Sequence, residues 1–338
     1  MTSTTGSVPA PRRLGSTGPL VFPLALGCMG MSGMYGAADE VESIATIHAA
    51  LDAGVTLLDT GDFYGSGHNE LLIARAIAGR RERALLSVKF GALRTPDGGW
   101  GGYDARPIAI RNFLAYSLKR LKVEHIDVYR PARLDPQVPI EEVIGAMADL
   151  VKAGYVRYIG LSEVGAATIR RAHAVHPICD LQIEYSLFSR APESGIFPVL
   201  QQLGIGITAY GVLSRGLISG SLPGNAGDLR AHLPRFSADN LQRNRALLAP
   251  LQQLAAEQGL SVAQLAIAWV LSRTPSMIAV IGARTRSQLA QSLAATQLQL
   301  TAADLQRITA AVPADAVAGE RYGEQQMRML DSERGNGA

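Results

Sequence analysis

The chain has 338 residues, 47% of them hydrophobic and 18% charged, and its formal net charge is +3. These values are typical of a globular protein and exclude a disordered chain. Lysines and arginines are scattered, and no apolar stretch reaches about 18 residues, so we expect neither a nucleic-acid partner nor a membrane span. Residues 1–12 lack an apolar signal core and are predicted to be a flexible leader of a cytoplasmic protein. Cys28 and Cys179 lie in apolar runs and are expected to be reduced core residues.

Short β-like runs alternate with helical patterns along the whole chain. The expected strands are residues 24–28, 56–59, 85–89, 126–129, 156–161, 178–183, 205–209 and 277–281. The expected helices are residues 39–53, 69–78, 106–121, 140–153, 166–176, 196–203, 240–258, 261–271 and 286–295. Glycine follows many of these helical patterns, as is typical of left-handed C-terminal caps.

Eight β/α units predict an α/β protein whose residues 13–338 form a single (β/α)8 TIM barrel domain. A doubly wound sheet is the alternative, but the G-x-G-x-x-G fingerprint after the first strand is absent. Residues 13–22 are expected to form an N-terminal β-hairpin across the bottom of the barrel. Insertions at about residues 92–104 and 211–239 follow strands, so these loops are expected on the C-terminal face, where barrels place their active sites.

Two of the predicted strands end in residues that together can form a proton donor. Asp59 ends the second strand, Lys89 ends the third, and Tyr64 follows Asp59 in the loop. Because strand ends of a barrel converge on one mouth, these three catalytic candidates are expected to meet, although each taken singly has a structural alternative as a helix cap or surface residue. The lysine ammonium is expected to lower the pKa of Tyr64, and the aspartate to keep the lysine charged. Such a phenol is a general acid toward a carbonyl oxygen, and no metal motif competes for the role.

Several segments carry a resemblance to a known family. They are residues 59–70 (DTGDFYGSGHNE), 88–89 (VK), 160–163 (GLSE), 209–217 (AYGVLSRGL) and 281–284 (IGAR). Together they resemble the aldo-keto reductases, over residues 13 to about 312. The resemblance implies a (β/α)8 barrel that binds NADPH without a Rossmann fold and reduces aldehydes or ketones. Residues 183–190 (IEYSLFSR) and the tail near residue 320 are similar to the pyridoxal reductase branch, which implies a small, pyridoxal-like or other carbonyl substrate.

The resemblance also implies a cofactor site for NADPH/NADP+ at the same mouth. Main-chain atoms of the first strand end would line the nicotinamide ribose, three residues of strands five and six would hold the carboxamide, and an aromatic ring would stack on the nicotinamide. A glycine-bounded loop would wrap the pyrophosphate, and an arginine at a helix start would select the 2′-phosphate. In that order the residues are Gly27, Cys28 and Met29; Ser162, Glu163 and Gln182; Tyr210; Gly211, Val212, Leu213, Ser214, Arg215 and Gly216; and Arg284, supported by Arg286, with Gln288, Ser292 and Asp59 also assigned to the cofactor site.

One position departs from the family pattern. Relatives carry a histidine that polarises the substrate carbonyl at the end of strand four, where this chain has Ala132. Two consequences stay open: Tyr64 acts as the sole acid in a roomier pocket, or the protein is an NADPH-binding sensor or auxiliary subunit with little turnover. His125 lies at the opposite end of the strand, and His68 lies near the mouth.

Two further arginines have alternative interpretations. Arg133 follows Ala132 and is favoured as a partner in a salt bridge at the barrel rim. Arg321 and its neighbour Tyr322 lie in the tail, which either reaches back over the mouth or docks on the surface. The oligomeric state cannot be read from the sequence.

Overall fold

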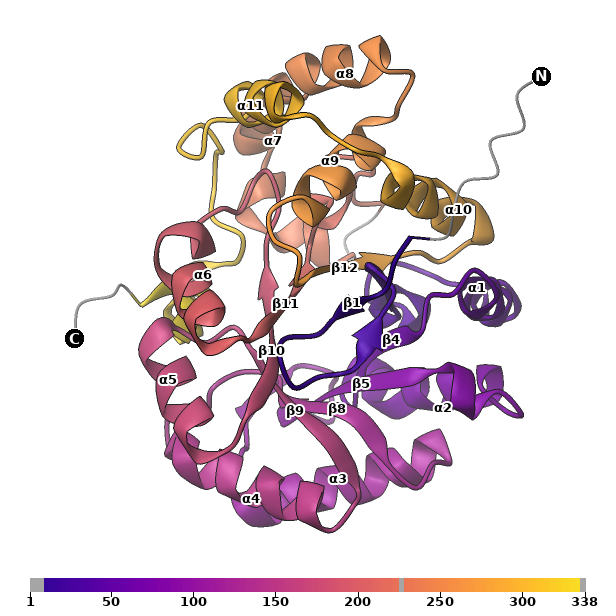
Figure 1. Ribbon diagram of the computed structural model, residues 1–338, viewed down its shortest axis with the longest axis vertical. Coiled ribbons are helices and arrows are strands. Elements are labelled where there is room, and N and C mark those ends of the chain that lie inside the picture. Colours follow the sequence, from indigo (N-terminus) through magenta and orange to yellow (C-terminus); the bar gives the residue numbers. More distant parts are fainter. Residues whose placement is uncertain (1–8, 225–227, 335–338) are drawn as a thin grey trace.

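The computed structural model describes residues 9–224 and 228–334 and consists of a closed barrel of parallel strands surrounded by helices (Figure 1). Neighbouring barrel strands follow one another along the chain, and the last strand pairs with the first to close the barrel. In order around the barrel the strands are β3 (Leu24–Gly27), β4 (Leu57–Gly61), β5 (Leu85–Phe90), β8 (Ile126–Pro131), β9 (Val156–Ser162), β10 (Ile178–Glu184), β11 (Gly206–Tyr210) and β12 (Met277–Gly282). The predicted (β/α)8 barrel is therefore confirmed, and every strand overlaps its predicted range.

Helices follow the strands and cover the outside of the barrel (Figure 1). Apolar side chains spaced three or four residues apart form the buried face of the helix that packs on β9, where Val143, Met147 and Leu150 are buried. The helices are α1 (Glu40–Asp52), α2 (His68–Ala76), α3 (Pro107–Leu121), α4 (Ile140–Lys152), α5 (Ala166–Val175), α6 (Pro192–Leu203), α7 (Ala238–Ala246), α8 (Leu248–Glu257), α9 (Val262–Leu271), α10 (Arg286–Ala294), α11 (Ala302–Ala311) and α12 (Glu324–Met329).

Two features of the helical layer differ from the sequence expectation. The helix expected over residues 240–258 is the pair α7 and α8, because Pro250 has no amide hydrogen to continue the backbone bonding across the junction. Helices α11 and α12 were not expected, although Thr301 and Asp304 form a capping box that begins α11. Among the described residues, no single helix is long and apolar enough to span a membrane, and one bent pair (238–257 with 262–271) qualifies by length and composition only.

The N-terminal hairpin lies across the bottom of the barrel, as expected (Figure 1). Its strands β1 (Arg12–Arg13) and β2 (Leu20–Val21) pair antiparallel. Gly15, with φ of +67°, fits closely against the barrel: a Cβ there would lie 2.3 Å from the Cys179 carbonyl oxygen. The backbone amide of Ser16 donates to Gly204 O at 2.7 Å, which ties the hairpin to a strand start. The first eight residues of the predicted leader lie outside the described residues.

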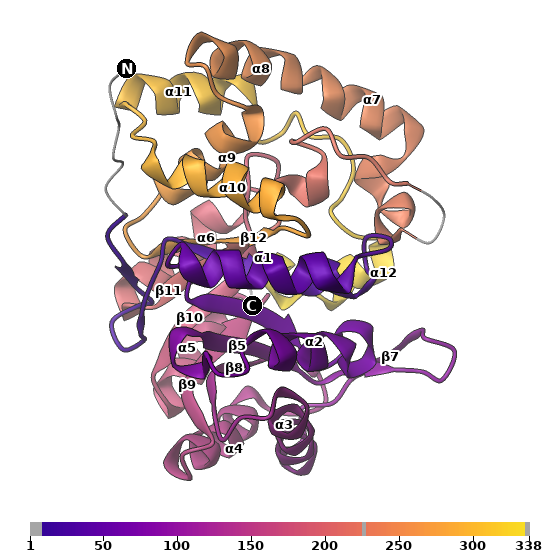
Figure 2. The same cartoon turned by 90° about the vertical axis from the view of Figure 1, so that its right-hand side faces the viewer.

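The insertions and the tail gather at the other end of the barrel, where Figure 2 shows the β6/β7 hairpin and α12 on the same side. The first insertion is this antiparallel hairpin, made of β6 (Ala92–Arg94) and β7 (Trp100–Tyr103). Short 3-10 helices occupy other connections, namely η1 (Met29–Ser32), η2 (Tyr64–Gly67), η3 (Arg81–Arg83), η4 (Ser214–Gly216), η5 (Leu229–His232), η6 (Pro234–Phe236), η7 (Ala295–Gln297) and η8 (Asp331–Glu333). Both insertions therefore extend the C-terminal face of the barrel.

Candidate active site

A network of buried polar side chains joins three strand ends at the C-terminal mouth. Lys89 of β5 donates from Nζ to Asp59 Oδ2 of β4 at 2.6 Å and to Gln182 Oε1 of β10 at 3.0 Å. Gln182 donates in turn from Nε2 to Asp59 Oδ1 at 2.8 Å, and Ser87 Oγ donates to the same oxygen at 2.9 Å. The sequence predicted the meeting of Asp59 and Lys89, and the structure adds Gln182 as a bridge between them.

Burial and charge act in opposite directions on this network. Burial favours the neutral acid at Asp59, but the charges of Lys89 and Arg130 and the hydrogen bonds from Lys89 and Gln182 outweigh it and lower the pKa of Asp59 below its usual value. Burial also lowers the pKa of Lys89, and the Asp59 carboxylate opposes this effect. Asp59 and Lys89 therefore stabilise each other's charged forms, although both side chains are buried.

Tyr64 begins η2 directly after β4, and its ring faces the lysine. The Lys89 Nζ atom lies 5.3 Å from the ring centroid, and Phe63 packs edge-on against the same ring at 4.8 Å. Burial, and then the negative charge of Asp59, raise the pKa of Tyr64 well above its ordinary value. This direction is opposite to the sequence expectation, because burial of the phenol and the negative charge of Asp59 outweigh the opposing charge of Arg133. Tyr64 therefore holds its proton firmly at neutral pH.

Strand β8 is followed by Ala132, at the position where relatives carry histidine, and then by Arg133. Ala132 is buried, packs in a cluster with Phe63 and Tyr64, and donates its backbone N–H to Phe90 O at 2.8 Å. Arg133 donates from Nη1 to Ala132 O at 2.6 Å and to Ser162 Oγ at 3.4 Å. Among the described residues no carboxylate lies within ion-pair distance of Arg133, so the interpretation of a rim salt bridge is wrong.

Neither of the two histidines considered from the sequence reaches this gap. His68 contacts Ser32 Oγ at 2.9 Å and Glu40 Oε1 at 2.6 Å, outside the lining of the cavity. His125 precedes β8, at the bottom of the barrel, with its Nε2 3.6 Å from Asp127 Oδ1. Within the described part of the chain, no group of His, Cys, Asp and Glu side chains is arranged to hold a metal ion.

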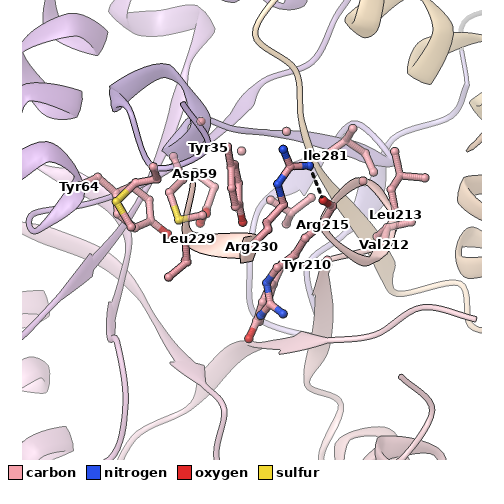
Figure 3. A pocket seen from close by; sticks show the side chains of 18 of the residues that line it. Tyr35, Asp59, Tyr64, Tyr210, Val212, Leu213, Arg215, Leu229, Arg230 and Ile281 are labelled. Carbon is pink, nitrogen blue, oxygen red and sulfur yellow. Dashed lines mark hydrogen bonds between the residues drawn. The ribbon is translucent and has the colours of Figure 1, made fainter. Parts of the chain in front are cut away.

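A cavity of about 490 Å³ extends from Tyr64 along the mouth to the loop after β11 (Figure 3). Backbone torsions in this loop lie repeatedly in the left-handed region, with φ of +66° at Gly211, +48° at Ser214, +55° at Arg215 and +96° at Gly216. Successive residues near such torsions direct backbone amides toward one concavity, which suits an anion such as a pyrophosphate. The non-glycine residues held there indicate backbone strain retained at a binding site.

The end of the cavity beyond β12 holds an arginine with no acidic partner among the described residues. Arg284 donates from Nη1 to the carbonyl oxygens of Tyr35 and Ala37, both at 3.1 Å. Its backbone N–H donates to Gln288 Oε1 at 2.9 Å, close to the start of α10. The neighbouring Arg286 is instead paired with Glu42 at 2.9 Å. Arg284 is therefore the residue here that is available to a bound phosphate.

Most of the residues predicted from the sequence line this one cavity. Four of them do not: Cys28, Ser214 and Glu163 are buried outside its lining, and Arg286 is paired with Glu42. The cavity-lining members of the predicted set are Gly27, Met29, Asp59, Tyr64, Lys89, Ser162, Gln182, Tyr210, Gly211, Val212, Leu213, Arg215, Gly216, Arg284, Gln288 and Ser292. Asp59 and Tyr64 lie at one end in Figure 3, and Val212 and Leu213 lie at the other.

The carboxylate of Glu163 is occupied by the C-terminal tail. Arg321 donates from Nη1 to its Oε1 at 3.0 Å and from Nη2 to its Oε2 at 2.6 Å. Tyr210 OH, Ser332 Oγ and the backbone N–H of Glu184 also donate to it, at 2.8, 2.7 and 2.8 Å. Burial opposes ionisation of Glu163, but Arg321, the charge of Arg133 and the hydrogen bond from Ser332 lower its pKa to about 2. A contact between Glu163 and a carboxamide stays a prediction, and its oxygens have other partners here.

The tail therefore reaches back over the mouth, which is one of the two alternatives left open by the sequence. Tyr322 lines the cavity, its hydroxyl lies 3.1 Å from Tyr210 OH, and it accepts from Arg133 Nη2 at 3.3 Å. The guanidinium of Arg215 stacks on the Tyr322 ring at 4.4 Å. This arrangement forms one wall of the cavity from a segment remote in sequence.

The cavity lining also includes residues that were missed from the sequence, and four of them are considered further: Tyr35, Tyr103, Arg230 and Leu229. Arg230 donates from Nη1 to Arg215 O at 3.0 Å, and Figure 3 shows it with Tyr35 between the two ends of the cavity. Three of the four lie in the predicted C-terminal-face insertions. The position of these insertions after strands thus indicated that they would contribute to the cavity. Which of their residues face the cavity depends on how each loop folds, and the sequence does not give this.

Comparisons with known proteins agree on one family. Residues 23–313 match the model of the aldo/keto reductase family. A probable aldo-keto reductase 1 of Glycine max is 41% identical over 321 residues, which cover 92% of this chain and 91% of that protein. The structure of a glycerol dehydrogenase from Gluconobacter oxydans superposes with a TM-score of 0.81 at 27% identity, over 98% and 99% of the two chains. An aldo/keto reductase from Klebsiella pneumoniae, in complex with NADP and acetate, gives 0.71 at 26% identity, over 90% and 96%.

Proposed function

Because the chain belongs to the aldo/keto reductase family, we propose that it is an NADPH-dependent reductase that converts an aldehyde or a ketone to an alcohol. One observation carries the proposal: Tyr64, a buried phenol beside the Lys89 ammonium, opens onto the same cavity as an anion-binding loop and the unpaired Arg284. A proton donor and the residues proposed to bind the cofactor phosphates thus line one cavity. NADPH, when bound, supplies the hydride, and the chain supplies the proton.

Tyr64 is proposed to be the general acid. Its raised pKa keeps the phenol protonated until a neighbouring oxygen gains negative charge. Lys89 then stabilises the phenolate that remains, since its ammonium lies against the ring at 5.3 Å. Asp59 and Gln182 hold that ammonium in place through bonds of 2.6 and 3.0 Å. Asp59 and Gln182 therefore affect the proton transfer by positioning Lys89, and they are not proposed to contact the substrate.

The proposed cofactor is NADPH rather than NADH. Arg284 contacts only backbone carbonyls among the described residues and can pair with a 2′-phosphate near the start of α10. The loop 211–216 is proposed to offer backbone amides to the pyrophosphate, and Tyr210, which lines the same cavity as Ser162, is proposed to stack on the nicotinamide. The complex of the Klebsiella pneumoniae protein with NADP supports this assignment.

Ala132 favours a second candidate function. With no histidine at this position, the site has one polarising donor fewer, and such a loss costs on the order of 10–1000-fold in turnover at comparable sites. A protein that binds NADPH as a sensor or auxiliary subunit would tolerate that loss. The complete set of Tyr64, Lys89 and Asp59 favours the reductase, because a sensor has no need of a buried proton donor.

The experiment is to mix the purified protein with NADPH and a panel of aldehydes and ketones that includes pyridoxal, and to follow the loss of nicotinamide absorbance. We expect consumption with at least one class of carbonyl compound. The Tyr64→Phe variant is expected to bind NADPH with unchanged affinity and to lose about 100-fold or more of the turnover, because it lacks the proton. Binding is measured separately, from the change in NADPH fluorescence.

Tyr116→Phe is the matched control, since Tyr116 is exposed on α3 and far from the cavity lining. This variant should reduce the same compounds at the wild-type rate. Tight NADPH binding without oxidation across the panel would support the sensor. Near wild-type reduction by Tyr64→Phe would show that another group is the acid.

A further inference from the structure

Four arginines line the cavity, and they fall into two groups. Arg215 is paired with Glu184 at 2.8 Å, and Arg230 is paired with Asp228 at 2.7 Å. Arg133 and Arg284 have no carboxylate within 4.0 Å among the residues that the structure describes. The proposed function gives Arg284 a phosphate of the cofactor. Arg133 is the second unpaired cation, and it has no such partner.

The groups that accept hydrogen bonds from Arg133 are all neutral in the described part of the chain. Its guanidinium donates to Ala132 O, Ser162 Oγ and Tyr322 OH, and its Nε has no hydrogen-bond partner in the described part of the chain. The side chain is partly buried and lines the cavity. The carboxylate of Glu163 exerts an attraction from farther away, but Arg321 already neutralises it. Burial lowers the pKa of Arg133, but Tyr210, Tyr322 and Glu163 outweigh burial and raise it above its usual value, so the guanidinium stays charged and can receive an anion from the cavity.

The position of Arg133 places that anion beside the reacting centre. Arg133 directly follows Ala132, which packs in one cluster with Tyr64 and Phe63. The loop 211–216 and Arg284 belong to strand ends β11 and β12, whereas Arg133 follows β8 next to the β5 lysine. If the phosphates of the cofactor bind at the ends of β11 and β12, no phosphate of the cofactor is left to pair with Arg133. The missing charge must come with the other ligand of the cavity.

We propose that the carbonyl substrate carries an oxyanion, a carboxylate or a phosphate, and that Arg133 binds it. This substrate class rests on the proposed reductase function. The planar guanidinium offers Nε and Nη2 as two parallel donors, a geometry that matches both oxyanions. The hydroxyl of Tyr322 lies against Nη2 at 3.3 Å and can add a third donor. Tyr64, Ala132 and Arg133 all line the same cavity.

Matched pairs of substrates test the proposal with NADPH and the full chain. Succinate semialdehyde is compared with butanal, and glyceraldehyde 3-phosphate with glyceraldehyde, so the two pairs distinguish a carboxylate from a phosphate. We expect kcat/KM of the wild type to favour the charged member of at least one pair by about 10-fold or more, mainly through KM. In Arg133→Met that ratio should fall to within about threefold, and Arg133→Lys should keep part of it.

Arg157→Met is the control, because Arg157 is an exposed arginine near the start of β9, at the bottom of the barrel. It should keep the wild-type ratio. A wild type that reduces neutral carbonyls without preferring either charged member overturns the substrate class and leaves the reductase standing. A ratio unchanged in Arg133→Met also overturns it. An equal fall of kcat for charged and neutral members would make Arg133 a carbonyl-polarising group instead, and weaker NADPH binding would make it a cofactor ligand.

A second measurement is independent of turnover. Titration calorimetry of succinate and of inorganic phosphate into the NADP+-loaded protein should detect binding of one of them, and Arg133→Met should weaken it by about 10-fold or more. If no carbonyl compound is reduced at all, the proposed function fails, and this titration still decides whether Arg133 is an anion site. Absence of binding by both anions contradicts the proposal.

Discussion

Two networks of buried charges lie at the same barrel mouth, and they are built from different parts of the chain. The first joins Asp59, Lys89 and Gln182, all at strand ends of the barrel. The second joins Glu163 and Glu184, also at strand ends, to arginines that include Arg321 of the tail at 2.6 and 3.5 Å. The members of both networks are buried, and each network pairs its carboxylates with cations, so the two resemble each other in chemistry.

They differ in what adjoins them. Lys89 lines the cavity, and its ammonium faces the ring of Tyr64 at 5.3 Å. Glu163 lies outside the cavity lining, and both of its oxygens accept hydrogen bonds from the tail. Arg215 of the second network also lines the cavity, but it pairs with Glu184 and stacks on Tyr322, whereas Lys89 of the first network faces the phenol of Tyr64. The first network is positioned for chemistry, and the second attaches the tail that walls the cavity.

Breaking the first network should have the largest effect on activity. Lys89→Met removes the charge that stabilises the phenolate of Tyr64, and we expect turnover to fall by about 1000-fold, comparable to loss of an electrostatic donor in other enzymes. The double variant with Tyr64→Phe should be scarcely slower than either single variant, because the two residues act as a unit. Steady-state kinetics with NADPH measures both effects.

Lys152→Met is the control for this change, since Lys152 is an exposed lysine at the end of α4. It should retain the wild-type turnover. If the losses in the double variant multiply, Lys89 and Tyr64 work independently, and the first network would be structural like the second.

Breaking the second network should affect stability more than chemistry. Arg321→Met leaves Glu163 buried without its bidentate partner, and we expect the free energy of unfolding to fall by about 2–4 kcal/mol. Urea denaturation measures this change. Limited proteolysis should cut the tail of this variant sooner, because residues 312–334 lose their main ionic attachment to the barrel.

Arg328→Met provides the comparison for Arg321. Arg328 forms an exposed pair with Glu324 on α12, and such a pair contributes about 0.2–1 kcal/mol. Its loss should leave both stability and tail cleavage close to wild type. Equal effects of the two variants would mean that the bond from Arg321 to Glu163 does not anchor the tail.

The two networks also differ in how far the sequence could reveal them. Asp59 and Lys89 were predictable, because short apolar runs mark β4 and β5 and parallel barrel strands end at one mouth. The bond between Arg321 and Glu163 spans 158 positions and depends on the path of the tail, which no local pattern encodes. The charge of Arg133 was visible in the sequence, but its lack of an acidic partner became apparent only from the positions of the surrounding loops.

The pKa of Tyr64 illustrates the same limit. The neighbouring lysine was predictable, and its effect on a phenol in water would lower the pKa. The extent of burial was not predictable, because it depends on the Phe63 contact and on the β6/β7 hairpin that covers this end of the cavity. The outcome was a raised pKa. The sequence identifies the charged groups near Tyr64. Whether charge or burial has the larger effect on its pKa depends on how the surrounding side chains pack.

Acid pH should weaken the second network gradually, which is the smallest effect expected here. Glu163 has a folded-state pKa of about 2, below its ordinary value of 4.5, so its contribution to stability is present above about pH 4.5 and is lost as the pH falls toward 2. Between pH 6 and pH 3.5 this loss should amount to about 1–2 kcal/mol of unfolding free energy. Asp59 and Glu184 also have lowered pKa values, so they weaken the fold in the same direction.

The Glu163→Gln variant isolates the share of Glu163, because glutamine has no proton to gain in this range. Its stability should depend on pH less steeply than that of the wild type, by about 1–2 kcal/mol over the same interval. Urea denaturation at each pH gives the slopes. If the two proteins lose stability in parallel, Glu163 titrates with an ordinary pKa, and Arg321 contributes too little to its ionisation to hold the tail against the barrel.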